Sequence, residues 1–365
     1  MERIMIIMGT RPEAIKLCPL VLELKKRKKQ EVLVCSTGQH RSMLDSVLRA
    51  FAVKPDFDLD VMRTGQTLSG VTARILRGLD EILTAERPDL VAVQGDTTTA
   101  FAGALAAFHK HIPIAHVEAG LRTYHMDSPF PEELHRQAIG LMADWHFAPT
   151  ETARDHLLRE GKNKKHVFVT GNTVVDALRF TLGNDFNRPS WNLPTDYRLV
   201  LFTTHRRENM GEPMKGLFRA LGRLVDTFPD VMAVCPLHHN PQVRAAAEVV
   251  RDHERIRIIE PPDIISFHQL LARSYLVVTD SGGIQEEAVA LGIPTIVTRY
   301  STERGEGVKA GVLRLAGCNE DGIVTLGKEL LKPNSKEYQK MKIPASVYGE
   351  GDASVRITDI LERIM

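Results

Sequence analysis

Short apolar runs alternate with longer amphipathic segments along the whole chain. The runs are apolar on both faces, as expected of parallel strands that helices cover on each side. We expect ten of them to be strands: Ile4–Met8, Val32–Cys35, Leu90–Val93, Ile112–Val117, His146–Ala148, Leu199–Thr203, Val231–Cys235, Ile256–Ile259, Leu276–Thr279 and Ile293–Thr298. Four segments between them have helical patterns: Pro12–Lys28, Leu68–Glu86, Pro213–Phe228 and Gln242–His253. The alternation predicts doubly wound parallel α/β sheets, with too many units for one domain.

The domain boundary is expected in the middle of the chain. The polar segment Gly183–Arg198 contains two prolines and precedes a predicted strand. Because Val174–Leu182 has a helical pattern, the hinge could instead fall at Gly171-Asn172. We therefore assign residues 1–172 to an N-terminal domain and residues 173–351 to a C-terminal domain.

Composition and charge exclude several classes of protein. Lys plus Arg number 47 and Asp plus Glu 46, so the net charge of +1 provides no overall field toward nucleic acid or an anionic membrane. The longest later apolar run, Ala100–Phe108, is far shorter than the roughly 20 residues of a membrane span. The run Ile4–Met8 is too short for a signal peptide, and the four cysteines have no paired spacing. We expect a cytoplasmic protein.

The loop after the first predicted strand has the features of an anion site. In open parallel sheets, ligands bind beyond the carboxyl ends of the strands. Arg11 begins the next helix and Lys16 lies about one turn further on, near free backbone N–H groups. The alternative interpretation is a surface Arg and a surface Lys. The loop lacks G-x-G-x-x-G, which argues against a dinucleotide cofactor.

Carboxylates follow two further strands of the first domain. Asp96 and Glu118 each come just after an apolar run, so they are candidates for one shared site. Asp96 could simply cap the helix that begins near Thr98, whereas Glu118 has no such structural explanation. Glu132 and Glu133 add two carboxylates at a predicted helix start, where one of the pair is expected to act only as a helix-dipole partner.

The second domain contains two polar loops after strands. His205 at a strand end, beside Arg206, could neutralise phosphate or transfer a proton. No segment there matches a metal-ligand spacing such as H-E-x-x-H. Ser281-Gly282-Gly283 joins a strand to a helix, and its glycines let the backbone approach a diphosphate. Glu287 lies one turn into that helix, where it can accept both ribose hydroxyls, so the loop predicts a nucleotide site.

Taken together, these loops resemble the non-hydrolysing UDP-N-acetylglucosamine 2-epimerases. The matching segments follow the family's order over almost the full chain: residues 9–16, 39–41, 95–99, 116–122, 129–133, 171–173, 205–209, 279–288 and 302–304. The resemblance implies a glycosyltransferase-B architecture, in which two Rossmann-like domains face each other across a cleft. It also implies that a C-terminal helix, residues 352–365, returns to the first domain.

The implied reaction interconverts UDP-GlcNAc and UDP-ManNAc through 2-acetamidoglucal, with no cofactor and no metal. The product would supply ManNAc-type sugars for bacterial surface polysaccharide, and a homodimer is expected, without nucleic-acid or membrane partners. The implied UDP-sugar ligands are Arg11, Lys16, His205, Phe267, Ser281, Gly282, Gly283, Glu287 and Arg304. The implied catalytic group is Asp96, Glu118, Glu132 and His205.

Some positions differ from the family pattern. Gly305 stands where most members have Pro, which loosens the loop after Arg304. Bacterial members bind a second UDP-GlcNAc as an activator, and Ser42 and Gly65 replace polar or basic residues there. The positions that match this regulatory site are Gln39, Glu132, Arg206 and His238. Three alternatives stay open: a retaining glycosyltransferase, a hydrolysing epimerase, and a nucleotide-sugar sensor without catalysis.

Overall fold

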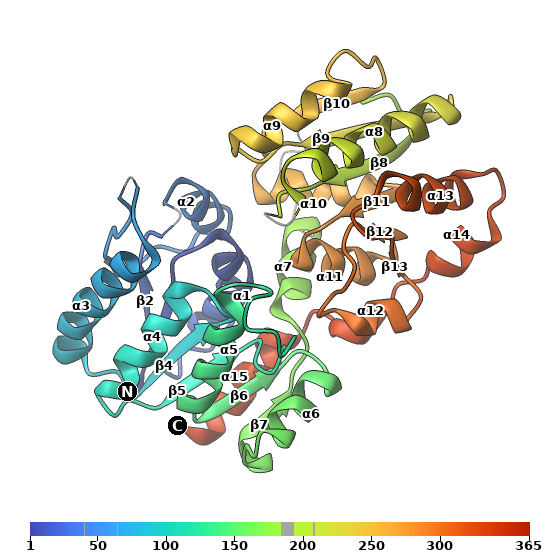
Figure 1. The fold of residues 1–365 in the computed structure, drawn as a ribbon. Helices are drawn as coiled ribbons and strands as arrows, with labels where there is room; N and C mark the ends of the chain where they lie inside the picture. Colours follow the sequence, from blue (N-terminus) through green and yellow to red (C-terminus); the bar gives the residue numbers. More distant parts are fainter. Residues whose placement is uncertain (40, 64, 184–192, 207–208) are drawn as a thin grey trace. The chain divides into compact units, whose positions relative to one another are not determined.

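The computed structural model describes residues 1–39, 41–63, 65–183, 193–206 and 209–365 (Figure 1). Contacts divide the chain into two compact units: unit 1, Met1–Phe180 with Tyr348–Met365, and unit 2, Thr181–Val347. The division falls within helix α7 (Thr173–Gly183), which begins directly after residue 172. Most of the polar segment Gly183–Arg198 lies outside the described residues, as do His40, Arg207 and Glu208 of the matched motifs.

Unit 1 is built on a parallel sheet, seven-stranded in the described residues, with the order β3-β2-β1-β4-β5-β6-β7. Alternate residues of β1 are buried on both faces, because helices cover both sides of the sheet. The strands are β1 (Arg3–Met8), β2 (Glu31–Ser36), β3 (Phe57–Asp58), β4 (Leu90–Gln94), β5 (Ile114–Val117), β6 (Trp145–Ala148) and β7 (Val167–Val169). The helices besides α7 are α1 (Arg11–Arg27), α2 (Arg41–Ala50), α3 (Leu68–Glu86), α4 (Thr98–His109), α5 (Glu132–Met142), α6 (Glu151–Arg159) and α15 (Ala353–Ile364).

Unit 2 has a second parallel sheet, six-stranded in the described residues, with the order β10-β9-β8-β11-β12-β13. Its strands are β8 (Arg198–Thr203), β9 (Val231–Pro236), β10 (Ile256–Ile259), β11 (Leu276–Thr279), β12 (Thr295–Val297) and β13 (Leu313–Leu315). Its helices are α8 (Glu212–Thr227), α9 (Pro241–Ala247), α10 (Ile264–Arg273), α11 (Gly282–Leu291), α12 (Gly305–Lys309), α13 (Glu320–Leu331) and α14 (Lys336–Met341). The predicted fold class, two doubly wound α/β domains, is confirmed.

Three element boundaries differ from the sequence prediction by two residues or more, each for a local reason. Strand β5 begins at Ile114, because the Ile112 N–H instead donates to Ala107 O at the end of α4. Strand β12 begins at Thr295 in the same way, since the Ile293 N–H donates to Ala288 O. The predicted helix Gln242–His253 ends as α-helix at Ala247 and continues as a 3₁₀ turn, Glu248–Val250.

The C-terminal segment completes unit 1. Helix α15, red in Figure 1, packs against α1. There Arg27 forms an ion pair of 2.5 Å with Asp359. The Asp176 carboxylate of α7 accepts hydrogen bonds from the first backbone N–H groups of α15. Before α15, Gly349 lies so close to Gly171 that a Cβ on Gly349 would be 3.0 Å from the Gly171 Cα. No helix within the described ranges is long and apolar enough to cross a membrane.

Candidate active site

The predicted site residues gather at one position in each sheet. Strand β1 pairs with β2 on one side and with β4 on the other, and β8 lies between β9 and β11 in the same way. The connections leave in opposite directions at these points, so a crevice forms outside the carboxyl ends of the strands. Arg11 and Asp96 follow β1 and β4, while His205 and Ser281 follow β8 and β11.

Glu13 of α1 joins the loop that follows β1 to the loop that follows β4. Its Oε2 accepts the N–H groups of Gly9 at 3.0 Å and Thr10 at 2.8 Å, and its Oε1 accepts the Thr97 hydroxyl at 2.7 Å. The Thr10 side chain caps the helix in return, which makes a capping box. Complete burial raises the pKa of Glu13 to about 7. The spacing T-x-x-E was the sequence signal for this role, which the sequence analysis did not assign.

Glu118 is held by two partners from distant parts of unit 1. Its Oε2 forms a buried ion pair with the Lys16 ammonium and accepts a hydrogen bond of 2.8 Å from Asn172 Nδ2. Its backbone has φ +62°, a left-handed conformation that costs energy for a residue with a side chain. A Cβ on Gly95 would lie 3.8 Å from Glu118 Oε1, so the carboxylate reaches the β4 loop. Asn172 was missed as a site residue, because only its motif was noted.

Asp96 contacts a cation rather than capping a helix. Arg136 forms an ion pair with its Oδ2, and the Arg136 Nε–H donates to the same oxygen at 3.1 Å. The cap of α4 is Thr97, whose hydroxyl accepts the Ala100 N–H at 3.0 Å. The alternative interpretation of Asp96 as a helix cap is therefore wrong.

The two glutamates at the start of α5 differ in their surroundings. Glu133 is fully buried and accepts hydrogen bonds from the backbone N–H groups of Thr123 and Tyr124, both at 3.0 Å. It also contacts Arg136 at 3.2 Å and so supports the cation that holds Asp96. Glu132 has a buried Oε2 with no hydrogen-bond partner among the described residues. Of the pair, Glu132 has the oxygen available for chemistry.

Two buried histidines lie among these carboxylates. Desolvation lowers the pKa of His116 to about 4, although Asp96 and Glu118 act on it in the opposite direction. Its Nε2 is 2.8 Å from Gly95 O, which fixes the loop that contains Asp96. Burial also lowers the pKa of His135, which interacts electrostatically with Asp96 and Glu132. The structure thus brings the three predicted carboxylates together around two buried histidine rings.

In unit 2, a buried carboxylate fixes the His205 loop. Asp280 is fully buried, and its Oδ1 lies 3.1 Å from His205 Nδ1. Its Oδ2 accepts hydrogen bonds from the backbone N–H groups of His205 and Arg206 and from the side chains of Thr204 and Asn209, at 2.8 to 3.1 Å. The contacts with His205 and these N–H groups hold the pKa of Asp280 well below its usual range. The His205 side chain is 40% exposed despite this contact.

The two glycines at the start of α11 have different surroundings. A Cβ on Gly282 would lie 2.8 Å from Arg304 Cζ, whereas a Cβ on Gly283 would meet no atom within 4 Å. The Arg304 guanidinium is buried and forms ion pairs with Glu286 at 3.0 Å and Glu303 at 2.5 Å. Ser281 precedes the helix without capping it through its side chain. Gly283 is therefore the position where the backbone is open to a ligand.

Glu287 and Phe267 lie on neighbouring helices of unit 2. Glu287 Oε1 is 3.2 Å from His268 Nε2, while Glu287 Oε2 is buried and has no partner among the described residues. The Phe267 ring is buried in an apolar cluster with Leu199 and Leu201 of β8. Glu287 therefore retains an acceptor, and the surroundings of Phe267 are those of a core residue.

The residues matched to the regulatory site are divided between the units. In unit 1, Gln39 Oε1 accepts the Thr99 hydroxyl at 2.9 Å. In unit 2, the exposed ring of His238 stacks near that of His205, with 5.9 Å between centroids. Arg206 donates its backbone N–H to Asp280.

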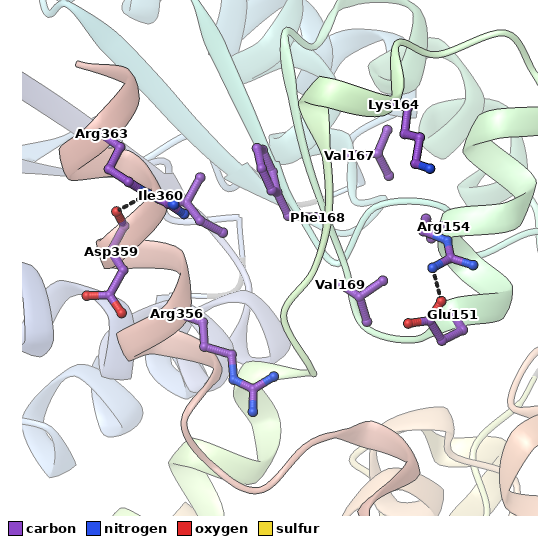
Figure 2. A pocket seen from close by; sticks show the side chains of 10 residues that line it. All are labelled: Glu151, Arg154, Lys164, Val167, Phe168, Val169, Arg356, Asp359, Ile360 and Arg363. Carbon is purple, nitrogen blue, oxygen red and sulfur yellow. Dashed lines mark hydrogen bonds and ion pairs between the residues drawn. The ribbon is translucent and has the colours of Figure 1, made fainter.

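A surface hollow of about 490 Å³ in unit 1 lies away from these residues (Figure 2). Arg154 of α6, Phe168 of β7 and Arg363 of α15 are among its lining residues, and none of the predicted site residues lines it. Within the described ranges, no group of three or more His, Cys, Asp or Glu side chains is arranged to hold a metal ion.

Comparison with known proteins agrees with the geometry. The family model of UDP-N-acetylglucosamine 2-epimerases matches residues 22–362. The Bacillus subtilis UDP-N-acetylglucosamine 2-epimerase is 51% identical over 98% of this chain and 94% of its own length.

Two solved structures have the same fold. The Staphylococcus aureus MnaA co-structure with UDP has a TM-score of 0.95 and 47% identity, covering 100% of this chain and 97% of its own. The Neisseria meningitidis UDP-GlcNAc 2-epimerase bound to UDP-GlcNAc has a TM-score of 0.94 and 40% identity, covering 99% and 100%. The chain therefore belongs to the UDP-N-acetylglucosamine 2-epimerase family and is an isomerase.

Proposed function

We propose that this protein interconverts UDP-GlcNAc and UDP-ManNAc by eliminating UDP and adding it back. The observation that carries the proposal is the carboxylate cluster of unit 1, in which Asp96 and Glu118 follow adjacent strands and each contacts a cation. Such a cluster suits proton transfer at a weakly acidic carbon. The relatives named above bind UDP or UDP-GlcNAc, which supports the substrate.

In the forward direction, a carboxylate removes the proton from carbon 2 of the sugar. The electron pair forms a carbon 1–carbon 2 double bond, and the bond from carbon 1 to the UDP oxygen breaks, which gives 2-acetamidoglucal and UDP. A proton then returns to carbon 2 from the opposite face, and UDP adds to carbon 1. Asp96, Glu118 and Glu132 are the groups proposed to move these protons.

UDP leaves as an anion, so it needs donors fixed in advance. We assign this role to Arg11, Lys16, His205, Ser281 and the backbone at Gly282 and Gly283. The orientation of His205 by Asp280 supports the assignment, because the ring is held while its exposed side stays available. Glu287 is assigned to the ribose, and its partnerless Oε2 supports that contact. Arg304 and Phe267 complete the set; Arg304 must give up part of its contact with Glu286 or Glu303 to reach a ligand.

Proton NMR of UDP-GlcNAc incubated with the protein in heavy water tests the proposal. We expect UDP-ManNAc that contains deuterium at carbon 2, because the returning proton comes from solvent. UDP-ManNAc without deuterium would rule out proton abstraction. Free ManNAc with UDP would indicate a hydrolysing epimerase, and turnover only with an added acceptor would indicate a glycosyltransferase. Binding without any turnover would indicate a sensor.

Helices α4 and α5 of unit 1 support the proposed homodimer. Phe108, Leu134 and Leu141 expose 54%, 52% and 79% of their surface, which is unusual for large apolar side chains on neighbouring helices. Leu141→Glu is expected to shift the mass in analytical ultracentrifugation from dimer to monomer. A dimer that survives this change would place the interface elsewhere.

Regulation, location and pathway complete the proposal. If a second UDP-GlcNAc binds at Gln39, Arg206 and His238, the initial rate should depend sigmoidally on substrate concentration. A hyperbolic dependence would exclude this activation.

We propose that the protein lies in the cytoplasm and supplies ManNAc-type sugars for surface polysaccharide. The buried thiols of Cys18 and Cys35 fit a reducing compartment. Deletion of the gene followed by analysis of cell-surface sugars tests the pathway.

A further inference from the structure

A buried histidine connects Glu287 to a hydroxyl on another helix. His268 of α10 is fully buried, with Nε2 at 3.2 Å from Glu287 Oε1 and Nδ1 at 2.6 Å from Thr181 Oγ1. A carboxylate can only accept hydrogen bonds, so Nε2 carries the proton. In the neutral ring, Nδ1 then accepts the Thr181 hydroxyl. Both ring nitrogens are satisfied, and the ring is fixed between the two.

The carboxylate of Glu287 has two unequal oxygens. Oε1 is held by His268, whereas Oε2 is buried and has no partner among the described residues. A buried carboxylate oxygen without a donor is costly, and such groups in proteins usually face a missing partner. Because His268 contacts only Oε1, Oε2 can accept hydrogen bonds from a ligand.

We propose that His268 is a positioning residue that makes the nucleotide site select ribose over deoxyribose. The inference rests on the proposed function, in which Glu287 binds the ribose of UDP. Helix α10 packs against α11, so His268 can fix the carboxylate from the protein side without touching the ligand. Both vicinal hydroxyls then meet a carboxylate that is already oriented.

The physical reason is the flexibility of glutamate. Three side-chain torsions separate the Glu287 carboxylate from its backbone, and a hydrogen bond from a rigid ring removes most of that freedom before the ligand arrives. A carboxylate without this hold would rotate to satisfy either one ribose hydroxyl or solvent. Discrimination against a nucleotide that lacks one hydroxyl would then fall, while contacts to the diphosphate would stay.

The test is calorimetric titration of UDP and 2′-deoxy-UDP into the wild type and three variants. The wild type is expected to bind UDP at least about tenfold more tightly than 2′-deoxy-UDP, as for loss of one hydrogen bond to a charged group. His268→Leu should reduce that ratio to about threefold or less, because leucine fills the space but donates nothing. His268→Gln should restore it, since its amide can donate to Oε1. Thr181→Val, which removes the outer partner only, should give an intermediate ratio.

The outcomes separate packing from positioning. His268→Leu that lowers the Tm but keeps the UDP preference would overturn the inference, because the ring would then act only in packing. Should His268→Leu fail to fold, Thr181→Val decides, and an unchanged ratio there overturns it. Glu287→Ala distinguishes failure of the positioning role of His268 from failure of the ribose contact of Glu287. If this variant loses the preference while His268→Leu keeps it, only the inference fails. If the wild type shows no preference, the ribose assignment of Glu287 fails and the inference with it.

Discussion

The two units use charge in opposite ways around their candidate residues. In unit 1, the carboxylates assigned to chemistry are held by cations: Glu118 by Lys16, and Asp96 by Arg136. In unit 2, two of the groups assigned to UDP are nitrogen-containing side chains held by buried acids: His205 by Asp280, and Arg304 by Glu286 and Glu303. Near the same topological switch point, unit 1 therefore holds acids with basic partners, and unit 2 holds His205 and Arg304 with acidic partners. Changes to these carboxylates of unit 1 should mainly affect turnover, and changes to the acids that hold His205 and Arg304 in unit 2 should mainly affect UDP binding.

The sharpest test of this division is Glu118→Gln. The amide keeps the shape of the side chain but cannot take up a proton, so we expect kcat to fall by about 100-fold or more. Calorimetry should show UDP affinity within a few-fold of the wild type. Glu160→Gln is the matched control, because Glu160 is also paired with a basic side chain of unit 1, that of Arg122, but is not assigned to the site. A large loss of UDP affinity in Glu118→Gln would contradict the proposed division between residues for turnover and residues for UDP binding.

Asp280→Asn should have the opposite signature. An asparagine offers a single acceptor oxygen and places an NH₂ group against N–H donors, so the His205 loop loses its fixed shape. We expect UDP affinity to fall by about tenfold or more. The control is Asp230→Asn, which changes an exposed ion pair with Arg198 in the same unit. Unaltered UDP binding in Asp280→Asn would mean that the loop is held by other contacts.

Gly282→Ala and Gly283→Ala form a matched pair within one helix turn. The new methyl at position 282 would displace Arg304 from its buried ion pairs, so we expect a loss of stability of about 1–3 kcal/mol. The methyl at position 283 meets no atom, so stability should be unchanged while UDP affinity falls. Thermal unfolding and calorimetry on both variants measure the two effects. Equal losses of stability would contradict this difference between the glycines.

Glu13→Gln should produce the smallest effect, about 1 kcal/mol from the lost cap. Its pH dependence is diagnostic. The folded pKa of Glu13 lies near 7, above the unfolded value of 4.5, so the native state binds more protons between these values. The wild-type free energy of unfolding should therefore fall, relative to that of the variant, as pH rises from 4.5 through 7. Urea unfolding at several pH values tests this, and a difference that stays constant would show that Glu13 does not titrate there.

The sequence predicted the central strands better than the edges. The run Leu276–Thr279 matches the central strand β11 residue for residue, because isolated apolar runs are typical of buried parallel strands. Of the described edge strands, the sequence predicted β10 (Ile256–Ile259). It missed β3, β7 and β13, which are short strands at sheet edges. Such strands have few residues and partial burial, so they leave little pattern to detect.

The candidate site shows a similar limit. The sequence predicted Asp96, Glu118, His205 and Glu287 because each follows a strand directly or lies in the helix that comes after the strand, a position that the sequence displays. The sequence did not predict the partners that hold these carboxylates. Asn172 lies 54 positions from Glu118 in the sequence, and Arg136 lies 40 positions from Asp96. Nothing local distinguishes Asn172, Arg136 or His268 from ordinary polar residues. Pairing over such separations is set by the tertiary fold.

The return of the C-terminal segment to unit 1 has a consequence for synthesis on the ribosome. The Asn172 N–H donates to Tyr348 O at 2.7 Å, and the Asn172 side chain holds Glu118. Tyr348–Met365 belong to unit 1, although they follow the whole of unit 2 in the sequence. Nascent chains usually fold in order from the N-terminus, but here unit 2 has its full sequence before unit 1 does. The contact that supports Asn172, and through it Glu118, therefore forms only after Tyr348 has been translated, so a nascent chain that stops after unit 2 lacks this part of the proposed site.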